Sequence, residues 1–386
     1  METRATRPIL SSLALLVLVP LSPCRAETRA RDSDDLLEWE ELAALPDIHG
    51  FAGPIVGIAC GALVVAGGTN FPDGRPWDGA TKVWHDRIFV LRDPAGEWIE
   101  LKERLPRPLA HAVSVTVPDG ILVIGGGDAS AHFREVFLLQ VDSDKVSFQS
   151  YPSLPVPLAL ASGAVVGRTV YVAGGMGQPS ALATSKSFFT LDLDQPPNRR
   201  AWRELESWPG PGRMLAAAAA REGAFYLFSG VDLSHSEAGI ARRTYLTDAY
   251  RFDPRCGWRR VSDLPRPAAA APAPSRALGS DQVLVIGGDT GEFAARVTEL
   301  KDSHPGFSHE ILAYHTHTDT WTTVGNLPRK LGSDPANRPN DGLWPPAVTA
   351  AVWWNGRLVI PTGEIRPGVR TPRVLTTTSV PRRVGP

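Results

Sequence analysis

ALVVAGG, at residues 62–68, is a short apolar run that ends in a pair of glycines, and it decides the fold because the chain repeats it. Five further runs keep this pattern or a degraded form of it: ILVIGGG (121–127), TVYVAGG (169–175), AFYLFSG (224–230), VLVIGGD (283–289) and RLVIPTGE (357–364). A motif that recurs in this way indicates a repeat architecture, in which each copy is one supersecondary unit that cannot bury its apolar faces alone.

The repeated unit has four strands. Each of the first five runs is followed by a second apolar strand, an edge segment with an aromatic residue and an LPRP-like turn, and an Ala/Val-rich strand then precedes the next glycine pair. The edge aromatics are Trp98, Phe148, Trp202, Trp258 and Trp321. Stacking six such sheets around an axis buries their faces. The pattern resembles the kelch repeat, so we expect residues 27–386 to form an all-β, six-bladed kelch-type β-propeller.

The last repeat is one strand short. After RLVIPTGE there is one more strand-like segment, TPRVLTTTSV (371–380), close to the C-terminus. The missing partner is available at the other end of the chain, because residues 36–46 contain Trp39 followed by Leu45 and Pro46, the signature of an outer strand. We therefore expect this N-terminal strand to complete the last blade, which closes the ring and removes exposed sheet edges.

Residues 1–26 have the features of a signal peptide. Arg4 and Arg7 form a basic start, residues 9–21 are apolar but too short to span a membrane, and Ala26 offers a small residue for cleavage. The mature protein is thus expected in the periplasm or outside the cell. An alternative, lipidation of Cys24, is disfavoured by the proline that precedes it. Cys60 and Cys256 lie in widely separated repeats and are expected to be unpaired thiols.

The charges exclude some classes of partner. The chain has 40 Lys+Arg against 41 Asp+Glu, and this balance gives no general attraction to nucleic acid or to an anionic membrane. Neither is expected as a partner, and no membrane contact is expected beyond the secretion signal. Oligomeric state does not follow from the sequence.

Long insertions fall on one side of the expected ring. They occupy residues 69–85, 231–246, 289–308 and 328–346, which connect second to third strands or one blade to the next. All such connections emerge on the same face, because the strands of a blade run alternately up and down. The connections of the opposite face are mostly short. Insertions on one face of a repeat protein mark its binding side, so we expect the site there.

The segment GEIRPGVRT, residues 363–371, carries the clearest chemistry. Glu364 ends one strand of the last blade, Pro367 and Gly368 suit the centre of a type II turn, and Arg370 opens the next strand. Both charged side chains can then face the insertion side, as a base beside an arginine that grips a carboxylate with two hydrogen bonds. The alternative is a solvated surface pair of little energetic weight.

This segment resembles the G-E-x-[KR]-P-G-x-R-T element of the bacterial N-acetylneuraminate epimerases, or sialic acid mutarotases, which are periplasmic kelch propellers. A second stretch, GFAG at residues 50–53 with AGGTNF at 66–71, resembles another element of those enzymes. In that family the second element lies downstream of the first. Here the order is rotated, so the chain resembles the family's cyclically permuted branch. Rotation is tolerated in a closed ring because the same strands pair wherever the termini lie.

The resemblance implies an isomerase. Glu364 matches the family's proton acceptor, and Arg370 matches the arginine that is important for activity. The implied reaction interconverts the α and β anomers of N-acetylneuraminate, or of a related small sugar acid, with Arg370 holding the carboxylate and with no cofactor or metal. The alternative is a non-catalytic kelch module that binds a glycan or a protein through the same face.

Further residues are candidates for substrate contact. Asn70 and His85 flank the first insertion, Arg213 follows a connection between blades, and Arg243 lies beside Arg242 in the fourth-blade insertion. Arg338 and Asn340 belong to the same weaker group. His315 and His317 fall at the opposite end of a strand, away from the insertions, and are interpreted as solvated residues and not as metal ligands.

Overall fold

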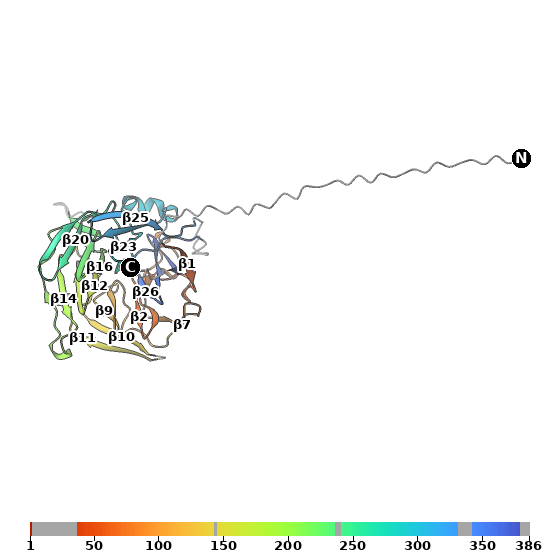
Figure 1. Ribbon diagram of the computed structural model, residues 1–386. Helices are drawn as coiled ribbons and strands as arrows, with labels where there is room; N and C mark the ends of the chain where they lie inside the picture. Colours follow the sequence, from red (N-terminus) through yellow and green to blue (C-terminus); the bar gives the residue numbers. More distant parts are fainter. Residues whose placement is uncertain (2–36, 143–144, 236–240, 331–341, 379–386) are drawn as a thin grey trace. The chain divides into compact units, whose positions relative to one another are not determined.

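The computed structural model describes residues 37–142, 145–235, 241–330 and 342–378, together with Met1. Over these residues the larger sheets are six four-stranded antiparallel sheets arranged around an axis (Figure 1). The architecture is a six-bladed β-propeller, which confirms the predicted fold class. The segment 2–26 of the expected signal peptide, including Cys24, lies outside the described residues.

The six blades share one strand plan. The inner strands are β2 (Ile55–Ala59), β8 (Val113–Val117), β12 (Ser162–Val166), β16 (Ala217–Arg221), β22 (Arg276–Leu278) and β26 (Val352–Trp354). The second strands hold the repeated apolar runs and are β3 (Ala62–Ala66), β9 (Gly120–Ile124), β13 (Thr169–Ala173), β17 (Ala224–Phe228), β23 (Gln282–Ile286) and β27 (Arg357–Arg366). The third strands are β6 (Ile88–Leu91), β10 (Val136–Asp142), β14 (Phe188–Asp192), β20 (Ala249–Asp253), β24 (Glu310–His315) and β28 (Val369–Thr377). The outer strands are β7 (Ile99–Glu100), β11 (Lys145–Tyr151), β15 (Arg203–Glu204), β21 (Gly257–Val261), β25 (Thr320–Asn326) and β1 (Trp39–Leu42).

The hydrophobic core lies between neighbouring blades. One cluster joins Val64 and Val90 of the first blade to Ile121 and Leu139 of the second. Corresponding clusters fill the other seams. The second strands are therefore buried on both faces, which explains why they read as continuous apolar runs instead of alternating with polar residues.

Edge tryptophans tie four of the blades to the blade before them. The indole N–H of Trp98 donates to the carbonyl of Ala43 (2.7 Å), and that of Trp202 donates to Pro152 (2.8 Å). Trp258 and Trp321 make the same contact with Glu206 and Ser262. In the second blade the corresponding residue is Phe148, which has no donor. A cavity of about 230 Å³ lies beside that ring.

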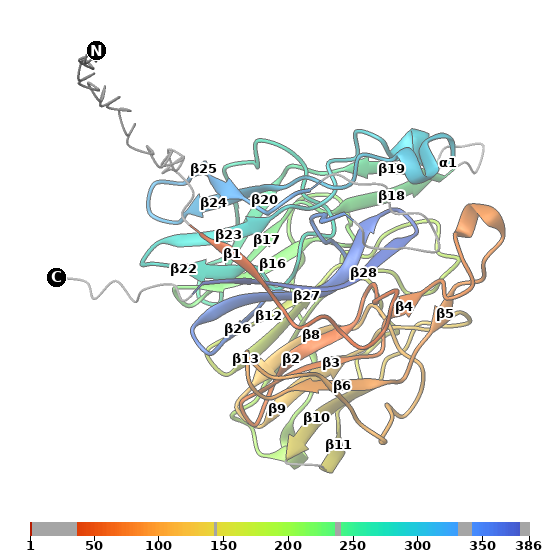
Figure 2. The same cartoon turned by 90° about the vertical axis from the view of Figure 1, so that its right-hand side faces the viewer.

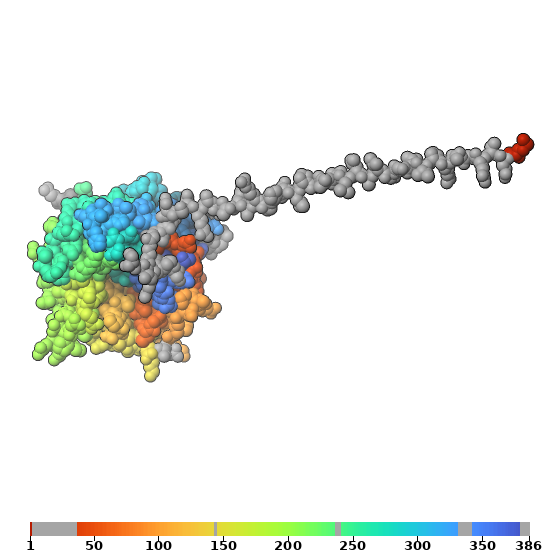
Figure 3. Space-filling model, viewed as in Figure 1, coloured from red at the N-terminus to blue at the C-terminus, as the bar shows by residue number. Residues whose placement is uncertain are grey.

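The predicted closure by the N-terminal strand is confirmed. β1 pairs antiparallel with β28 in a register that runs from Trp39 opposite Thr377 to Leu42 opposite Val374. Figure 3 shows the red-orange residues near residue 40 beside the blue residues of the last blade. Ion pairs of Arg357 with Glu40 and of Arg373 with Glu41 cross the same edge.

Six backbone hydrogen bonds form a closed ring around the axis, here called the axial ring. Each runs from the N–H of the residue shortly before one inner strand to the carbonyl of the equivalent residue in the preceding blade. The bonds, donor first, are Gly53 to Val348 (2.7 Å), His111 to Gly53 (2.8 Å), Leu160 to His111 (3.0 Å), Leu215 to Leu160 (2.9 Å), Ala270 to Leu215 (2.8 Å) and Val348 to Ala270 (2.8 Å). All six residues have φ between 51° and 63°. Five of them are not glycine, so the ring holds residues in a conformation that ordinarily costs roughly 1–3 kcal/mol each.

The described parts of three insertions, 69–85, 231–246 and 289–308, emerge on one face, as expected, while most of the fourth, 328–346, lies outside the described residues. Figure 2 shows β4 (Thr69–Asn70), β5 (Val83–Trp84), β18 (Val231–His235), β19 (Ala241–Tyr245) and α1 (Val297–Leu300) together at the right-hand side. Three short 3-10 helices complete the insertions: η1 (Pro76–Asp78), η3 (Ala294–Arg296) and η4 (Lys301–Ser303). Cys60 and Cys256 are free thiols. No helix within the described ranges has the length and apolar character needed to cross a membrane.

Gly50 offers a test of how tightly the N-terminal segment packs on the last blade. Its φ is +68°, and a Cβ at this position would overlap the carbonyl oxygen of Thr371. We expect Gly50→Ala to lower the free energy of unfolding by about 3 kcal/mol or more, measured by denaturant titration. Gly61→Ala is the matched control, because Gly61 has a φ of +77° with nothing near its would-be Cβ. It should cost only about 1 kcal/mol. Equal losses in the two variants would contradict the packing described.

Candidate functional site

Glu364 and Arg370 face each other across the hairpin that joins β27 to β28. They are direct partners in the strand register, and Nη1 of Arg370 lies 3.3 Å from Oε1 of Glu364. The turn between them places Gly368 at φ +82°, as the expected type II turn requires. The backbone N–H of Gly368 donates to the same Oε1 at 2.7 Å. The structure therefore brings the two residues together on the insertion face.

Arg370 is a buried cation with unused donors. Its side chain is 6% exposed, and neither Nε nor Nη1 makes a hydrogen bond to any described residue. Its guanidinium lies 4.7 Å from the centre of the Phe71 ring. Burial lowers the pKa of Arg370, and the charge of Glu364 partly offsets this. Burying a guanidinium whose N–H groups are not all hydrogen-bonded is costly, which makes Arg370 a candidate for binding an anionic ligand.

The two sequence elements that carry the family resemblance are in contact. The hydroxyl of Thr362 accepts a hydrogen bond from the N–H of Phe51 (2.7 Å) and donates to the carbonyl of Thr371 (2.6 Å). Residues 50–53 thus pack directly behind the segment 363–371, although more than 300 residues separate them in sequence.

Asn70 and His85 support this arrangement from the first blade. Nε2 of His85 donates to Oδ1 of Asn70 at 2.7 Å, and the Asn70 amide nitrogen donates to the carbonyl of Gly50 at 3.1 Å. Burial lowers the pKa of His85, and its ring contacts that of Phe51 edge-on at 5.1 Å. Asn70 is only 1% exposed. The pair therefore holds the 50–53 segment in place behind the site.

Arg213 was a candidate for substrate contact, and its surroundings are those of a structural residue. Its side chain is fully buried, with Nη2 2.7 Å from a carboxylate oxygen of Asp248 and Nη1 2.9 Å from the carbonyl of Ser229. The guanidinium also lies 5.4 Å from the Trp208 ring centre. A cation so enclosed is structural, and we remove it from the candidate site.

The other basic candidates are not brought to Glu364 by any described contact. Arg243 and Arg242 are exposed on the β18–β19 hairpin, where they pair with Leu233 and Ser234. Arg338 and Asn340 lie outside the described residues. At the opposite end of the blades, His315 contacts Thr322 and His317 contacts Glu222.

Two residues that the sequence interpretation missed lie near the pair. The charges of Arg370 and Glu364 both act on the Lys82 ammonium, and burial with the Arg370 charge lowers its pKa. Burial, Lys82 and Arg370 together lower the pKa of His111 to about 3, so its imidazole is neutral at physiological pH. His111 occupies an axial-ring position that is glycine, alanine, valine or leucine in the other blades. Comparing the repeats position by position could have identified it.

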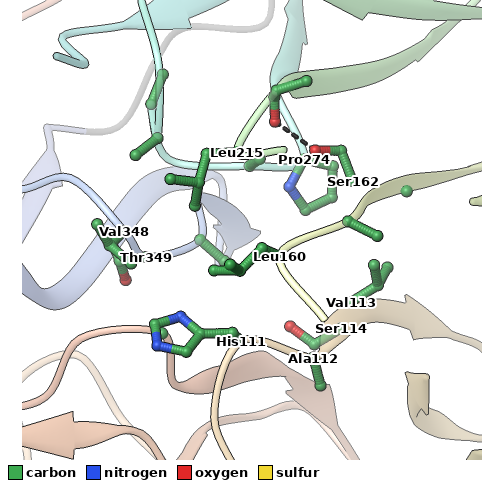
Figure 4. Close-up of a pocket in the computed structure, with 18 of the residues that line it drawn as sticks. His111, Ala112, Val113, Ser114, Leu160, Ser162, Leu215, Pro274, Val348 and Thr349 are labelled. Atoms are coloured by element: carbon green, nitrogen blue, oxygen red, sulfur yellow. Dashed lines mark hydrogen bonds between the residues drawn. The ribbon is translucent and has the colours of Figure 1, made fainter. Parts of the chain in front are cut away.

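The axial channel is a separate feature. It encloses about 80 Å³ and is lined mainly by small and apolar residues, with His111, Leu160, Leu215 and Val348 around it (Figure 4). Neither Glu364 nor Arg370 lines it. The axial channel is therefore separate from the Glu364–Arg370 pair.

The hairpin that bears the pair is held by two insertions. Gly368 packs against Pro76 of η1, and Trp77 joins a cluster with Ile365, Val369 and Trp344. Asp302, in the fifth-blade insertion, forms an ion pair with Arg75 at 3.2 Å, and its carbonyl accepts from Arg366 at 2.9 Å. The positions of Glu364 and Arg370 are thus fixed from both sides.

Fold and site together define a six-bladed propeller with a buried arginine–carboxylate pair on its insertion face. The family model for N-acetylneuraminate epimerase matches residues 25–148 and 151–296, which is more than half of the chain. The chain belongs to this family.

Individual relatives agree with this membership. The chain is 31% identical over 248 residues to an N-acetylneuraminate epimerase of Haemophilus influenzae (strain PittEE), a match that covers 58% of each chain. It is 26% identical over 247 residues to one of Yersinia pestis (strain Pestoides F). The match thus spans less than two thirds of these relatives. A solved structure of YjhT superposes with a TM-score of 0.60 over 74% of this chain and 87% of its own, at 15% identity, which supports the fold.

Arg213 generates a test that separates structural from ligand-binding arginines. Replacing it by leucine leaves Asp248 buried without its cation, and we expect Arg213→Leu to lower the free energy of unfolding by about 3–5 kcal/mol. Arg243→Leu, at an exposed position, should change it by less than about 0.5 kcal/mol. Chemical denaturation of both variants makes the comparison. A small effect at Arg213 would show that it is not a structural residue.

Proposed function

We propose that this protein is a mutarotase that interconverts the α and β anomers of N-acetylneuraminate or a closely related sugar acid. The observation that carries the proposal is the buried Arg370 guanidinium paired with the carboxylate of Glu364 across one hairpin of the insertion face. A sugar acid brings an ionised carboxylate and a hydroxyl on the same carbon. An arginine and a base side by side match those two groups.

In this proposal Arg370 holds the sugar and Glu364 moves the proton. The guanidinium donates two roughly parallel hydrogen bonds to the carboxylate, which fixes both position and orientation. Glu364 then accepts the proton of the anomeric hydroxyl, the bond from the anomeric carbon to the ring oxygen breaks, and the open-chain ketone recloses on its other face. The reaction neither oxidises nor reduces the sugar, so it requires no redox cofactor.

Several findings support the proposal. The chain belongs to the N-acetylneuraminate epimerase family, and the relatives named above carry that description. The matched residues end at 296, before the 363–371 segment, so the roles of Glu364 and Arg370 rest on the motif and the geometry. A comparison that follows the chain from one end to the other cannot align both halves of a rotated sequence. A match that ends at residue 296 therefore agrees with the rotated order of the two elements. The N-terminal segment 1–26 supports a periplasmic or secreted location.

The test follows anomer exchange by NMR. A sialidase releases the α anomer of N-acetylneuraminate, and its conversion to the β anomer is timed with and without the protein. We expect the wild type to accelerate conversion and Glu364→Gln to lower kcat about 10²–10⁴-fold, the contribution typical of a general base. Arg370→Lys should raise KM, because lysine cannot make the paired hydrogen bonds.

The control is Glu97→Gln, an exposed glutamate on a short connection of the opposite face, which should match the wild type. No acceleration by wild type, or equal acceleration by Glu364→Gln, would refute the proposal. Saturable binding of the sugar without any turnover would support the alternative, a binding module that uses the same face.

A further inference from the structure

The proposed reaction needs a second proton-transfer group. When the ring opens, the ring oxygen gains a proton while the anomeric hydroxyl loses one. Both oxygens are attached to the carbon that also bears the carboxylate. A proton donor to the ring oxygen must therefore lie beside both Glu364 and Arg370.

Lys82 is placed there by the first-blade insertion. The short β4–β5 ladder pairs Asn70 with Val83, so Phe71 and Lys82 are the next residues on its two strands. Phe71 lies against the Arg370 guanidinium at 4.7 Å. Pro76, from the loop between these residues, packs on Gly368 in the hairpin turn. The insertion therefore brings Lys82 to the same side of the site as Arg370.

The Lys82 ammonium is free to contact a ligand. It is half-buried, yet it makes no hydrogen bond or ion pair with any residue in the described part of the chain. Its one side-chain contact of note is with the Trp84 ring, 4.9 Å from the centroid. Burial and the neighbouring Arg370 lower its pKa, which makes the ammonium a better acid near neutral pH.

Two other groups near the pair fit less well. The charge of Glu364 acts on His304, but Nδ1 of His304 already accepts from the N–H of Gly306 at 3.1 Å. His111, with a pKa of about 3, is neutral at physiological pH, and a neutral imidazole is too weak an acid for this step. Of these three groups, Lys82 fits the role of proton donor best.

We infer that Lys82 is the proton donor to the ring oxygen, an inference that rests on the proposed function. Glu364 takes the hydroxyl proton, the electron pair of that O–H bond forms the ketone, and the pair of the breaking C–O bond goes to the ring oxygen. That oxygen takes a proton from the Lys82 ammonium. Ring closure on the other face returns both protons, so the enzyme ends the cycle unchanged.

The test combines two substitutions at Lys82 in the anomer-exchange assay. Lys82→Arg keeps the positive charge but cannot release a proton, so kcat should fall about 10²-fold or more while KM stays within about threefold. Lys82→Ala should lower kcat by a comparable factor, and added ethylammonium should restore activity to this variant. The wild-type rate should also fall as the pH is raised and Lys82 loses its proton, at a pH below the usual range for lysine. This alkaline decrease should be absent in Lys82→Ala.

The controls separate this inference from the function on which it rests. Lys102→Ala, at an exposed lysine, should behave as wild type and should not respond to ethylammonium. If wild type is active and Glu364→Gln is not, but Lys82→Arg keeps full kcat or the amine fails to rescue Lys82→Ala, the donor role is overturned and the function stands. If wild type itself does not accelerate exchange, both are overturned.

Discussion

The axial ring of six backbone hydrogen bonds is the constraint on which the rest of the structure depends. Each bond crosses from one blade to the next, so the ring exists only when all six blades are in place. In each blade, the residue just before the ring member pairs with the residue just after that blade's glycine pair or its degraded equivalent. In the last blade these are Ala347 and Glu364, joined by two backbone hydrogen bonds of 2.7 and 2.8 Å. The position of the proposed base is thus set by the ring.

One N-terminal segment links the ring to the site. β1 completes the sheet that contains β27 and β28, Gly50 packs on Thr371 beside Arg370, and Gly53 is itself a ring member. Residues 39–53 therefore take part in three features: they close the ring of blades, support Arg370 from behind and contribute Gly53 to the axial ring. Because a closed propeller pairs the same strands wherever its termini fall, a rotated order of elements can preserve the site.

The sequence could predict the features that depend on local pattern. Glycine pairs, apolar runs and edge aromatics mark the blades, and Trp39 with Leu45 marks the strand that closes the ring. Arg213 was misplaced because its partner, Asp248, lies 35 residues away and only the folded blade brings them together. Lys82 was missed for a similar reason: its importance arises from the approach of the first insertion to the last blade. A single sequence carries no local signal for such contacts between blades.

The most direct measurement is a crystal structure of the Glu364→Gln variant with N-acetylneuraminate bound. The account predicts that the sugar lies at the insertion face, with its carboxylate hydrogen-bonded to the Arg370 guanidinium. Its anomeric hydroxyl should be within hydrogen-bond distance of the amide that replaces the Glu364 carboxylate, and its ring oxygen should face Lys82. A sugar bound elsewhere, or bound here with its carboxylate away from Arg370, would contradict the account.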